Sequence, residues 1–278
     1  MRDSWIMIVL LFLISSCDEN QPTYTLVRPQ PSDRNVLVEE FSGALCPNCP
    51  QGTEALDDLR SLYGSNLIII TIHAGDFAFP FEDSKYDFAT SDGDALISLL
   101  GNPIGYPSAV INRTRTSGSD VFQQFASKWA SSVVEALEEP AMLDMDQQIA
   151  FNLEDRLLTV EVGILAFEDI DKSLRLSVVI IEDDIVDRQA DRAAPTGVVD
   201  DYVHKNVLRV YLTPVEGDQI VPSLGALAST RHSYSFQMPP EEGWWKAEQC
   251  QVVSFITTGS PSTDDLVVLQ VIETDVID

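Results

Sequence analysis

Residues 36–50, Val-Leu-Val-Glu-Glu-Phe-Ser-Gly-Ala-Leu-Cys-Pro-Asn-Cys-Pro, decide the expected fold. Residues 35–41, Asn-Val-Leu-Val-Glu-Glu-Phe, contain an apolar run with two valines, which predicts a strand. Residues 50–63 place apolar side chains at helical spacing, and Gly64 follows as a natural stop. Residues 66–73 form a second run rich in β-branched side chains, which is typical of a buried parallel strand. The order strand, helix, strand indicates a βαβ unit with two cysteines at the start of its helix.

Cys46 and Cys49 are three residues apart, a spacing that lets a disulfide close at the start of this helix. Free N–H groups and the positive end of the helix dipole favour a thiolate on the first cysteine. Cys46 is therefore the candidate nucleophile for thiol–disulfide exchange, and Cys49 is the candidate resolving thiol. The pair could instead be an inert structural bridge. Two thiols supply half of the about four ligands that zinc needs, so we expect no metal and no cofactor.

The same region resembles thioredoxin over residues 35–138. Residues 36–46 align without gaps to its first core strand and active-site loop. Glu40 stands where thioredoxin keeps a buried acid, so the resemblance implies that this carboxyl moves a proton to and from Cys49. Glu40 lies beside Glu39 and could equally be the solvated end of a strand.

A second part of the resemblance is Tyr106-Pro107, which precedes a strand expected at residues 107–112. In thioredoxin the corresponding proline follows a cis peptide bond, which is a rare geometry. The resemblance implies that Tyr106 and Pro107 contact the backbone of a bound polypeptide, and a trans Pro107 is the alternative. Leu45 replaces the usual tryptophan, the dipeptide between the cysteines differs, and residues 74–102 are a longer insertion. The redox direction therefore does not follow from the sequence.

The N-terminus carries the features of a lipoprotein signal. Residues 5–14 are an unbroken apolar run that is too short to span a bilayer but suits a signal-peptide core. Ile14-Ser15-Ser16-Cys17 resembles a lipobox, which predicts cleavage before Cys17 and acylation of its thiol. An ordinary secretory signal with an incidental cysteine is the alternative. Residues 17–33 are expected to be a tether.

The C-terminal half has a different pattern. Residues 120–137 predict an amphipathic helix that Pro140 ends. Runs with strand character follow at residues 144–153, 157–167, 173–181, 206–213, 231–237, 250–257 and 266–273. Residues 185–200 fit no clear element. Many short strands at this spacing indicate an antiparallel β-sandwich.

The expected fold class is thus an α/β thioredoxin-like N-terminal domain followed by an all-β, immunoglobulin-like sandwich domain. The expected divisions are a signal peptide at 1–16, a tether at 17–33, the thioredoxin-like domain at 34–140 and the sandwich at 141–278. Cys250 is left without a partner and is expected to be a buried free thiol.

The charge balance excludes one class of partner. The chain has 17 lysines and arginines against 44 aspartates and glutamates, a formal net charge of −27. A field of this sign repels phosphate backbones, so nucleic acid is not an expected partner.

The layout as a whole resembles the outer-membrane-protein-28-related lipoproteins of Bacteroidota-type bacteria. Three stretches carry this resemblance: residues 39–50, residues 105–113 with Gly105-Tyr106-Pro107, and residues 202–209. The resemblance implies an outer-membrane lipoprotein anchored through Cys17, which faces either the cell surface or the periplasm. The resemblance predicts where the protein is located better than it predicts what the protein does.

Two functional interpretations stay open. In the first, the protein exchanges thiols and disulfides with partner proteins in the cell envelope, using Cys46, Cys49, Glu40, Tyr106 and Pro107. In the second, it is a surface binding or adhesion-like module, with the thioredoxin fold as scaffold and a structural disulfide. An exposed Cys46 sulfur favours the first interpretation, and a buried disulfide favours the second.

Overall fold

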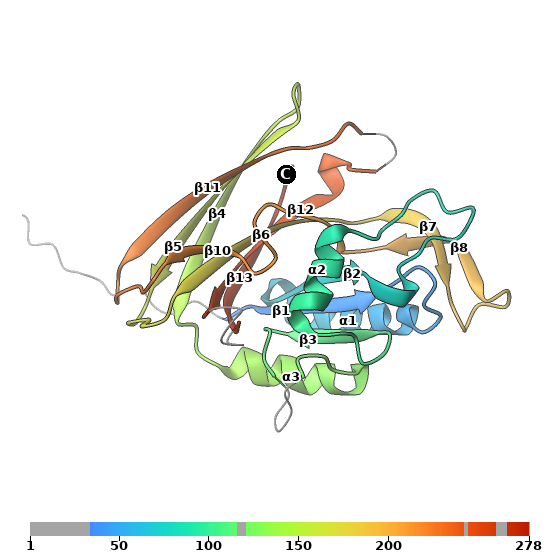
Figure 1. Ribbon diagram of the computed structural model, residues 1–278, viewed down its shortest axis with the longest axis horizontal. Coiled ribbons are helices and arrows are strands. Elements are labelled where there is room, and N and C mark those ends of the chain that lie inside the picture. Colours follow the sequence, from blue (N-terminus) through green and yellow to red (C-terminus); the bar gives the residue numbers. More distant parts are fainter. Residues whose placement is uncertain (1–33, 116–120, 242–243, 260–265, 278) are drawn as a thin grey trace, which may run out of the picture.

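The computed structural model describes residues 34–115, 121–241, 244–259 and 266–277, and Figure 1 labels its elements. The helices are α1 (Cys49–Tyr63), α2 (Ser91–Leu100) and α3 (Ala126–Glu138). The strands are β1 (Val36–Ser42), β2 (Leu67–His73), β3 (Ser108–Ile111), β4 (Leu143–Asn152), β5 (Leu157–Ala166), β6 (Leu174–Glu182), β7 (Ile185–Ala190), β8 (Val198–His204), β9 (Val207–Tyr211), β10 (Asp218–Val221), β11 (Ser229–Gln237), β12 (Cys250–Thr258) and β13 (Val268–Asp275). The expected signal peptide, tether and Cys17 lie outside the described residues.

An eight-stranded sheet runs through the molecule (Figure 1). Its order is β13-β12-β6-β9-β2-β1-β3, and β10 pairs with β6. β1 and β2 are parallel, whereas β3 runs antiparallel to β1. A second sheet, β11-β5-β4, packs against β6 and β12 through one apolar core. β7 and β8 form a separate two-stranded hairpin.

The predicted fold class, a thioredoxin-like α/β domain followed by a separate immunoglobulin-like sandwich, is wrong. The structure is mostly β, with 42% strand and 20% helix. Its main sheet joins β1, β2 and β3 to strands of the C-terminal half, because β2 pairs with β9 at Thr71 and Val207. The backbone groups at the edge of β2 need partners, and hydrophobic periodicity does not say which strand supplies them. The division expected at residue 140 stays a prediction.

The two faces of β1 enter different cores. Successive side chains of a strand point to opposite faces. Leu37 and Phe41 pack with α2 and with strands of the C-terminal half, whereas Val36 and Val38 pack beneath α1 and α3. Residues at odd positions of β1 therefore face one core and residues at even positions face the other.

Two local features place the ends of the helices. Gly64 ends α1 with a positive φ of 57°, a conformation that glycine adopts readily. The helix expected from residue 120 begins only at Ala126, because Gln124 exchanges two backbone hydrogen bonds with Ala109 of β3. The described helices include none that is long and apolar enough to cross a membrane.

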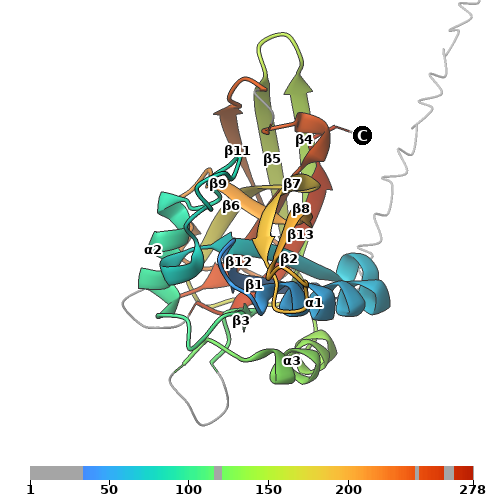
Figure 2. The ribbon, with the colours of Figure 1, turned by 90° about the vertical axis from the view of Figure 1, so that its right-hand side faces the viewer.

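The β7–β8 hairpin fills the region that the sequence left unassigned. It leaves the body of the molecule after β6 and returns to it at β9. Figure 2 shows the hairpin in front of β1 and reaching down to the start of α1. A segment from the C-terminal half thus lies against the cysteine loop.

Candidate functional site

Two adjacent glutamates of β1 are fully buried. Glu39 and Glu40 are each 0% exposed, so the alternative of a solvated strand end does not apply. Because they are neighbours on a strand, Glu39 faces the core shared with the C-terminal half and Glu40 faces α1. The site is built on the Glu40 side.

Glu39 has a complete set of partners. Arg113 donates to both of its oxygens, at 2.7 and 2.9 Å, and both side chains are 0% exposed. The Arg113 guanidinium also lies over the Phe255 ring and 3.4 Å from the Tyr211 hydroxyl. A buried, bidentate pair of this kind compensates both charges within the core.

Glu40 forms no ion pair with any residue that the structure describes. Its Oε2 accepts a hydrogen bond from Thr71 Oγ1 at 3.2 Å, and its buried Oε1 has no hydrogen-bond partner. Burial raises the pKa of Glu40 to about 8, so the carboxyl is mostly protonated at neutral pH. A carboxyl in this state can give up a proton and take one back near neutral pH.

Cys46 and Cys49 form a disulfide at the start of α1. Two turn hydrogen bonds shape the loop, from Cys46 N–H to Gly43 O at 3.0 Å and from Cys49 N–H to Cys46 O at 3.3 Å. Each cysteine is only 1% exposed. In this conformation the disulfide is therefore closed to a thiol in solution.

Gly52 connects the disulfide helix to the other predicted site residues. A Cβ atom at this position would lie 2.6 Å from Pro107 Cγ and 3.0 Å from Glu40 Oε1. The absence of a side chain on the first turn of α1 thus lets Glu40 and Pro107 approach it closely. The Tyr106–Pro107 bond is cis, as the resemblance implied, and the Tyr106 hydroxyl donates to Ala74 O at 2.7 Å.

The β7–β8 hairpin covers the disulfide by polar contacts to the cysteine loop. Gln189 Nε2 donates to Gly43 O at 3.1 Å and to Cys46 O at 3.0 Å. The backbone N–H of Ala190 donates to Ala44 O at 2.8 Å, two residues before a similar bond from Arg192. Gln189 is 2% exposed, so its amide is a buried bridge between hairpin and loop.

A cavity of about 10 Å³ lies between the hairpin and the disulfide, which is room for one water molecule. Cys49, Thr71, His73 and His204 line it, among others. Burial lowers the pKa of His204 to about 4 and lowers that of His73 well below its usual value, so both rings are neutral. Within the described parts of the chain, the buried atoms His73 Nδ1 and His204 Nε2 have no hydrogen-bond partner. The described residues contain no group of three or more side chains placed to hold a metal ion.

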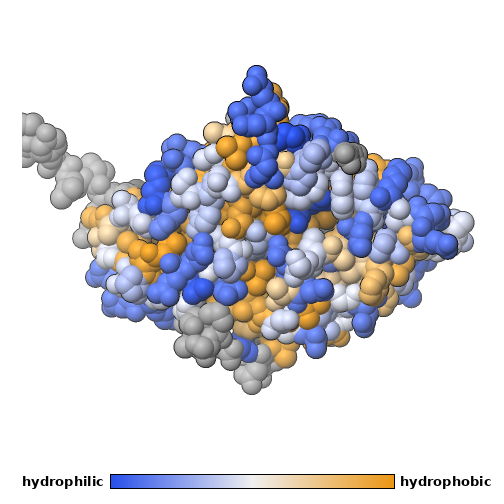
Figure 3. Space-filling model, turned by 45° about the horizontal axis from the view of Figure 1, so that its top comes forward, coloured by the Kyte–Doolittle hydropathy of each residue, from blue (hydrophilic) through white to orange (hydrophobic). Residues whose placement is uncertain are grey.

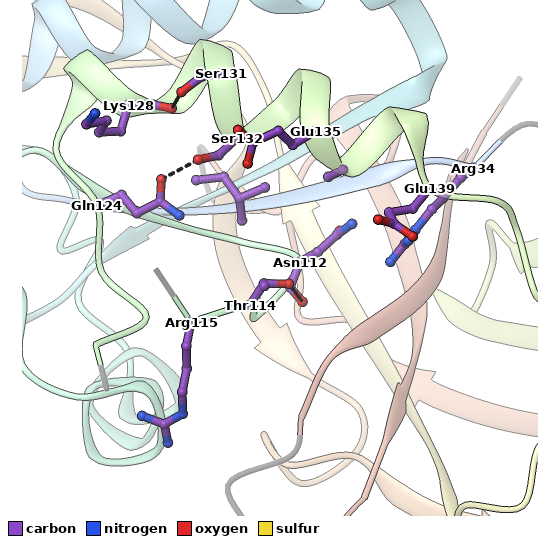
Figure 4. Close-up of a pocket in the computed structure, with 12 residues that line it drawn as sticks. Arg34, Asn112, Thr114, Arg115, Gln124, Lys128, Ser131, Ser132, Glu135 and Glu139 are labelled. Atoms are coloured by element: carbon purple, nitrogen blue, oxygen red, sulfur yellow. Dashed lines mark hydrogen bonds between the residues drawn. The ribbon is translucent and has the colours of Figure 1, made fainter. Parts of the chain in front are cut away.

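A second cleft lies between α3 and the end of β3, with a volume of about 430 Å³ (Figure 4). Ser132 donates to Gln124 Oε1 across it at 2.7 Å. Its lining mixes the cations Arg34 and Lys128 with carboxylates of α3, and it contains none of the predicted site residues. The disulfide region thus remains the candidate site.

The structure places Glu40 and Pro107 against Gly52, three residues after Cys49 on the disulfide helix, whereas the roles predicted for these residues and for Cys46 stay predictions. Two groups of residues near the site were not predicted to belong to it. Thr71 and the histidines at 73 and 204 line the cavity, and the hairpin residues 189–192 cover the disulfide. Thr71 carried a signal, because it is a polar residue inside the apolar run 67–72. The hairpin carried none, because residues 185–200 show no clear periodicity.

Cys250 is a buried free thiol, as predicted. Burial raises the pKa of its thiol above the usual value, so it is a poor nucleophile. It lies on β12, in the core between the two sheets.

Comparison with known proteins gives one family and a set of similar folds. A model of the Omp28 family, described as outer membrane protein Omp28, matches residues 97–277. HBP35 of Porphyromonas gingivalis aligns with a TM-score of 0.66 and 19% identity, covering 88% of this chain and 76% of that chain. Protein AGR_C_4864 from Agrobacterium tumefaciens aligns with a TM-score of 0.53 and 12% identity, covering 90% of this chain and 97% of that chain. No curated protein matches the sequence. At these identities the two structures are similar in fold alone.

Proposed function

The chain belongs to the Omp28 outer membrane protein family, and we propose that in the cell envelope it exchanges thiols and disulfides with partner proteins through Cys46 and Cys49. Association with the outer membrane follows from the family. Acylation of Cys17, and exposure at the cell surface, are further parts of this proposal.

The unpaired Glu40 is the observation that carries the proposal. A buried carboxyl without a cation reduces the stability of the folded state, so it is a poor structural element. Its Oε1 faces the first turn of the helix that begins at Cys49. With a pKa of about 8, Glu40 matches the ordinary pKa of a thiol, which is about 8.5. Proton transfer between the two groups therefore has little thermodynamic cost.

The exchange needs no cofactor, because the disulfide itself carries the two electrons. A partner thiolate attacks Cys46 Sγ, a bond forms between these sulfurs, and the Cys46–Cys49 bond breaks. Cys49 leaves as a thiolate and takes the proton of Glu40, through Thr71 and a water molecule in the small cavity. A second partner thiolate then attacks the partner's sulfur in the mixed disulfide, that disulfide breaks, and Cys46 leaves as a thiolate. The two protons that the partner thiols lose to water on ionising return to the Cys46 thiolate and to the Glu40 carboxylate. Two partner thiols thus become one disulfide, the two cysteines gain two electrons and two protons, and Glu40 ends protonated as it began. The reverse reaction runs through the same steps.

The reduction potential of the Cys46–Cys49 pair tests the proposal. The protein is equilibrated in glutathione buffers, and the fraction reduced is read by thiol alkylation, with Cys46→Ser as the control. A potential of roughly −120 to −270 mV supports exchange and gives its direction. A potential below about −300 mV indicates a structural disulfide and contradicts the proposal.

The buried disulfide favours a second candidate function, a surface binding module in which the bridge is structural. The two cysteines are each 1% exposed. The face in Figure 3 also presents a band of apolar residues across its middle, bordered by polar ones. A partner that binds equally well to the wild type and to Cys46→Ser would support this function over exchange.

A further inference from the structure

We propose that the β7–β8 hairpin occupies the docking site of an extended, basic segment of a partner protein, and that the partner displaces it to reach the disulfide. The inference rests on the proposed function, because it names the substrate class and the regulation of the same site. The exchange step itself is the one given above.

The hairpin contacts the cysteine loop through two backbone donors. Ala190 N–H donates to Ala44 O at 2.8 Å, and Arg192 N–H donates to Pro47 O at 2.9 Å. Ala190 is the last residue of β7, and Arg192 lies in the turn that follows. These two bonds use main-chain atoms alone, so the backbone of another polypeptide can reproduce them.

Only the base of the hairpin is firmly attached. Ile185 packs with Phe88 and Val207 in a small apolar cluster. Asp187, at 2% exposure, accepts backbone hydrogen bonds from Lys85 and Tyr86. The base of the hairpin is therefore packed and hydrogen-bonded as the rest of the core is.

The outer part of the hairpin is held by fewer and more polar contacts. Among the described strands β7 pairs with β8 alone, and an isolated two-stranded hairpin is at best marginally stable in water. Over the disulfide its contacts are polar: the Gln189 amide, two backbone bonds, the exposed bond from Arg192 to Asn48 and a side-chain hydrogen bond between Tyr202 and Thr53. Segments with few buried apolar contacts open locally at low free-energy cost.

The β7–β8 ladder is irregular between its base and its outer part. The pairing of β7 with β8 shifts register between Asp187 and Gln189. An irregularity of this kind disrupts the ladder locally and bends the strand. The outer part can therefore move about this point while Ile185 and Asp187 keep their contacts.

Charge indicates the chemistry of the partner. Arg188 pairs with Asp83 of the N-terminal half and with Asp200 of β8. When the outer part of the hairpin moves, Asp83 loses this cation. The chain has a net charge of −27, so a basic segment with a cysteine would replace the lost pair and be attracted from a distance.

The first experiment measures how fast dithiothreitol reduces the disulfide in the full chain, read by alkylation of the released thiols. Gln189→Ala removes the amide that closes the hairpin, and we expect reduction to become about tenfold faster, as the loss of two hydrogen bonds implies. Replacing residues 189–199 by Asn-Gly, which suits a tight hairpin turn, should accelerate it further.

Gln147→Ala is the matched control. Gln147 also donates its amide to a buried carbonyl, Val252 O at 3.0 Å, but it lies on β4, away from the disulfide. We expect its reduction rate to equal that of the wild type. Equal acceleration in both variants would mean that reduction follows global unfolding, which would overturn the inference.

The second experiment tests the partner. A short lysine-rich peptide with one cysteine is compared with the same peptide N-methylated at two alternate amides, in its rate of mixed-disulfide formation with the shortened-hairpin variant. We expect the N-methylated peptide to be about tenfold slower, because two backbone bonds are lost. Equal rates would overturn the docking of a polypeptide.

These outcomes separate the inference from the proposed function. If the reduction potential lies in the exchange range but Gln189→Ala leaves the rate unchanged, the hairpin does not control access and only the inference fails. If the potential is too low for exchange, the proposed function fails whatever the rate of either variant.

Discussion

The two faces of β1 give its two glutamates different environments. Glu39 and Glu40 are adjacent, and both are completely buried. Glu39 is held at both oxygens by Arg113, whereas Glu40 has one bond from a neutral hydroxyl and an oxygen without a partner. The first arrangement holds two halves of the chain together, and the second keeps a titratable proton against the first turn of the disulfide helix. Pairing, rather than burial, therefore separates a structural carboxyl from a candidate functional one.

The Glu39 side gives the largest expected effect. Arg113→Met leaves Glu39 buried and uncompensated, so we expect the free energy of unfolding to fall by about 3–5 kcal/mol. Urea unfolding measures the loss. The double variant Glu39→Leu with Arg113→Met should recover most of it, because it removes both charges together. A loss below about 1 kcal/mol in the single variant would show that the pair contributes no more than a surface one.

Replacing Glu40 by glutamine should stabilise the protein at high pH. The pKa of Glu40 is about 8 in the folded state, above its usual value of 4.5, so the folded state binds the extra proton. Stability from this group is complete below about pH 4.5 and is lost as the pH rises through about 8. Glu40→Gln removes this dependence, so relative to wild type it should gain about 3–4 kcal/mol at pH 9 and little at pH 5. Urea unfolding at the two pH values measures it, and an equal difference at both would contradict a raised pKa.

Gly52 tests how closely the Glu40 side is packed. Gly52→Ala places a Cβ against Pro107 and Glu40, and the approach to Pro107 is too short for real atoms. We expect a loss of about 1–3 kcal/mol from overpacking. Gly197→Ala is the comparison. Among the described residues nothing lies within 4 Å of the Cβ that this change adds, so it does not overpack the protein. Its cost is limited to backbone strain, because Gly197 has a φ of 77°. If Gly52→Ala were as stable as wild type in thermal unfolding, the contact between α1 and the cis-proline would be loose.

The smallest expected effect concerns an exposed ion pair. Lys205 and Asp57 are about 2.8 Å apart, but their side chains are 42% and 40% exposed. Lys205→Ala should change the free energy of unfolding by less than about 0.5 kcal/mol, and the change should disappear in high salt. A salt-independent loss of more than about 1 kcal/mol in urea unfolding would mean that the pair is effectively buried.

The sequence predicted elements better than their assembly. Periodicity located β1, α1 and β2, and the cysteine spacing located the disulfide, because these signals are local. The placement of β9 beside β2 depends on which backbone edges meet, and residues 207–211 carry no mark of that choice. For the same reason the cover over the disulfide was missed: the backbone N–H of Ala190 is one that any residue but proline supplies, and nothing local marks the Gln189 amide as a partner of the cysteine loop.

The continuity of the main sheet has a consequence for biogenesis. The strand that completes the edge of β2 and the residues that cover the disulfide both come from the C-terminal half of the chain. Until that half has folded, β2 is an open edge and the bonds from residues 189–192 to the cysteine loop are not made. Cys46 and Cys49 are therefore more accessible in a partly folded chain than in the finished sheet, and oxidation before the hairpin docks meets the least steric obstruction.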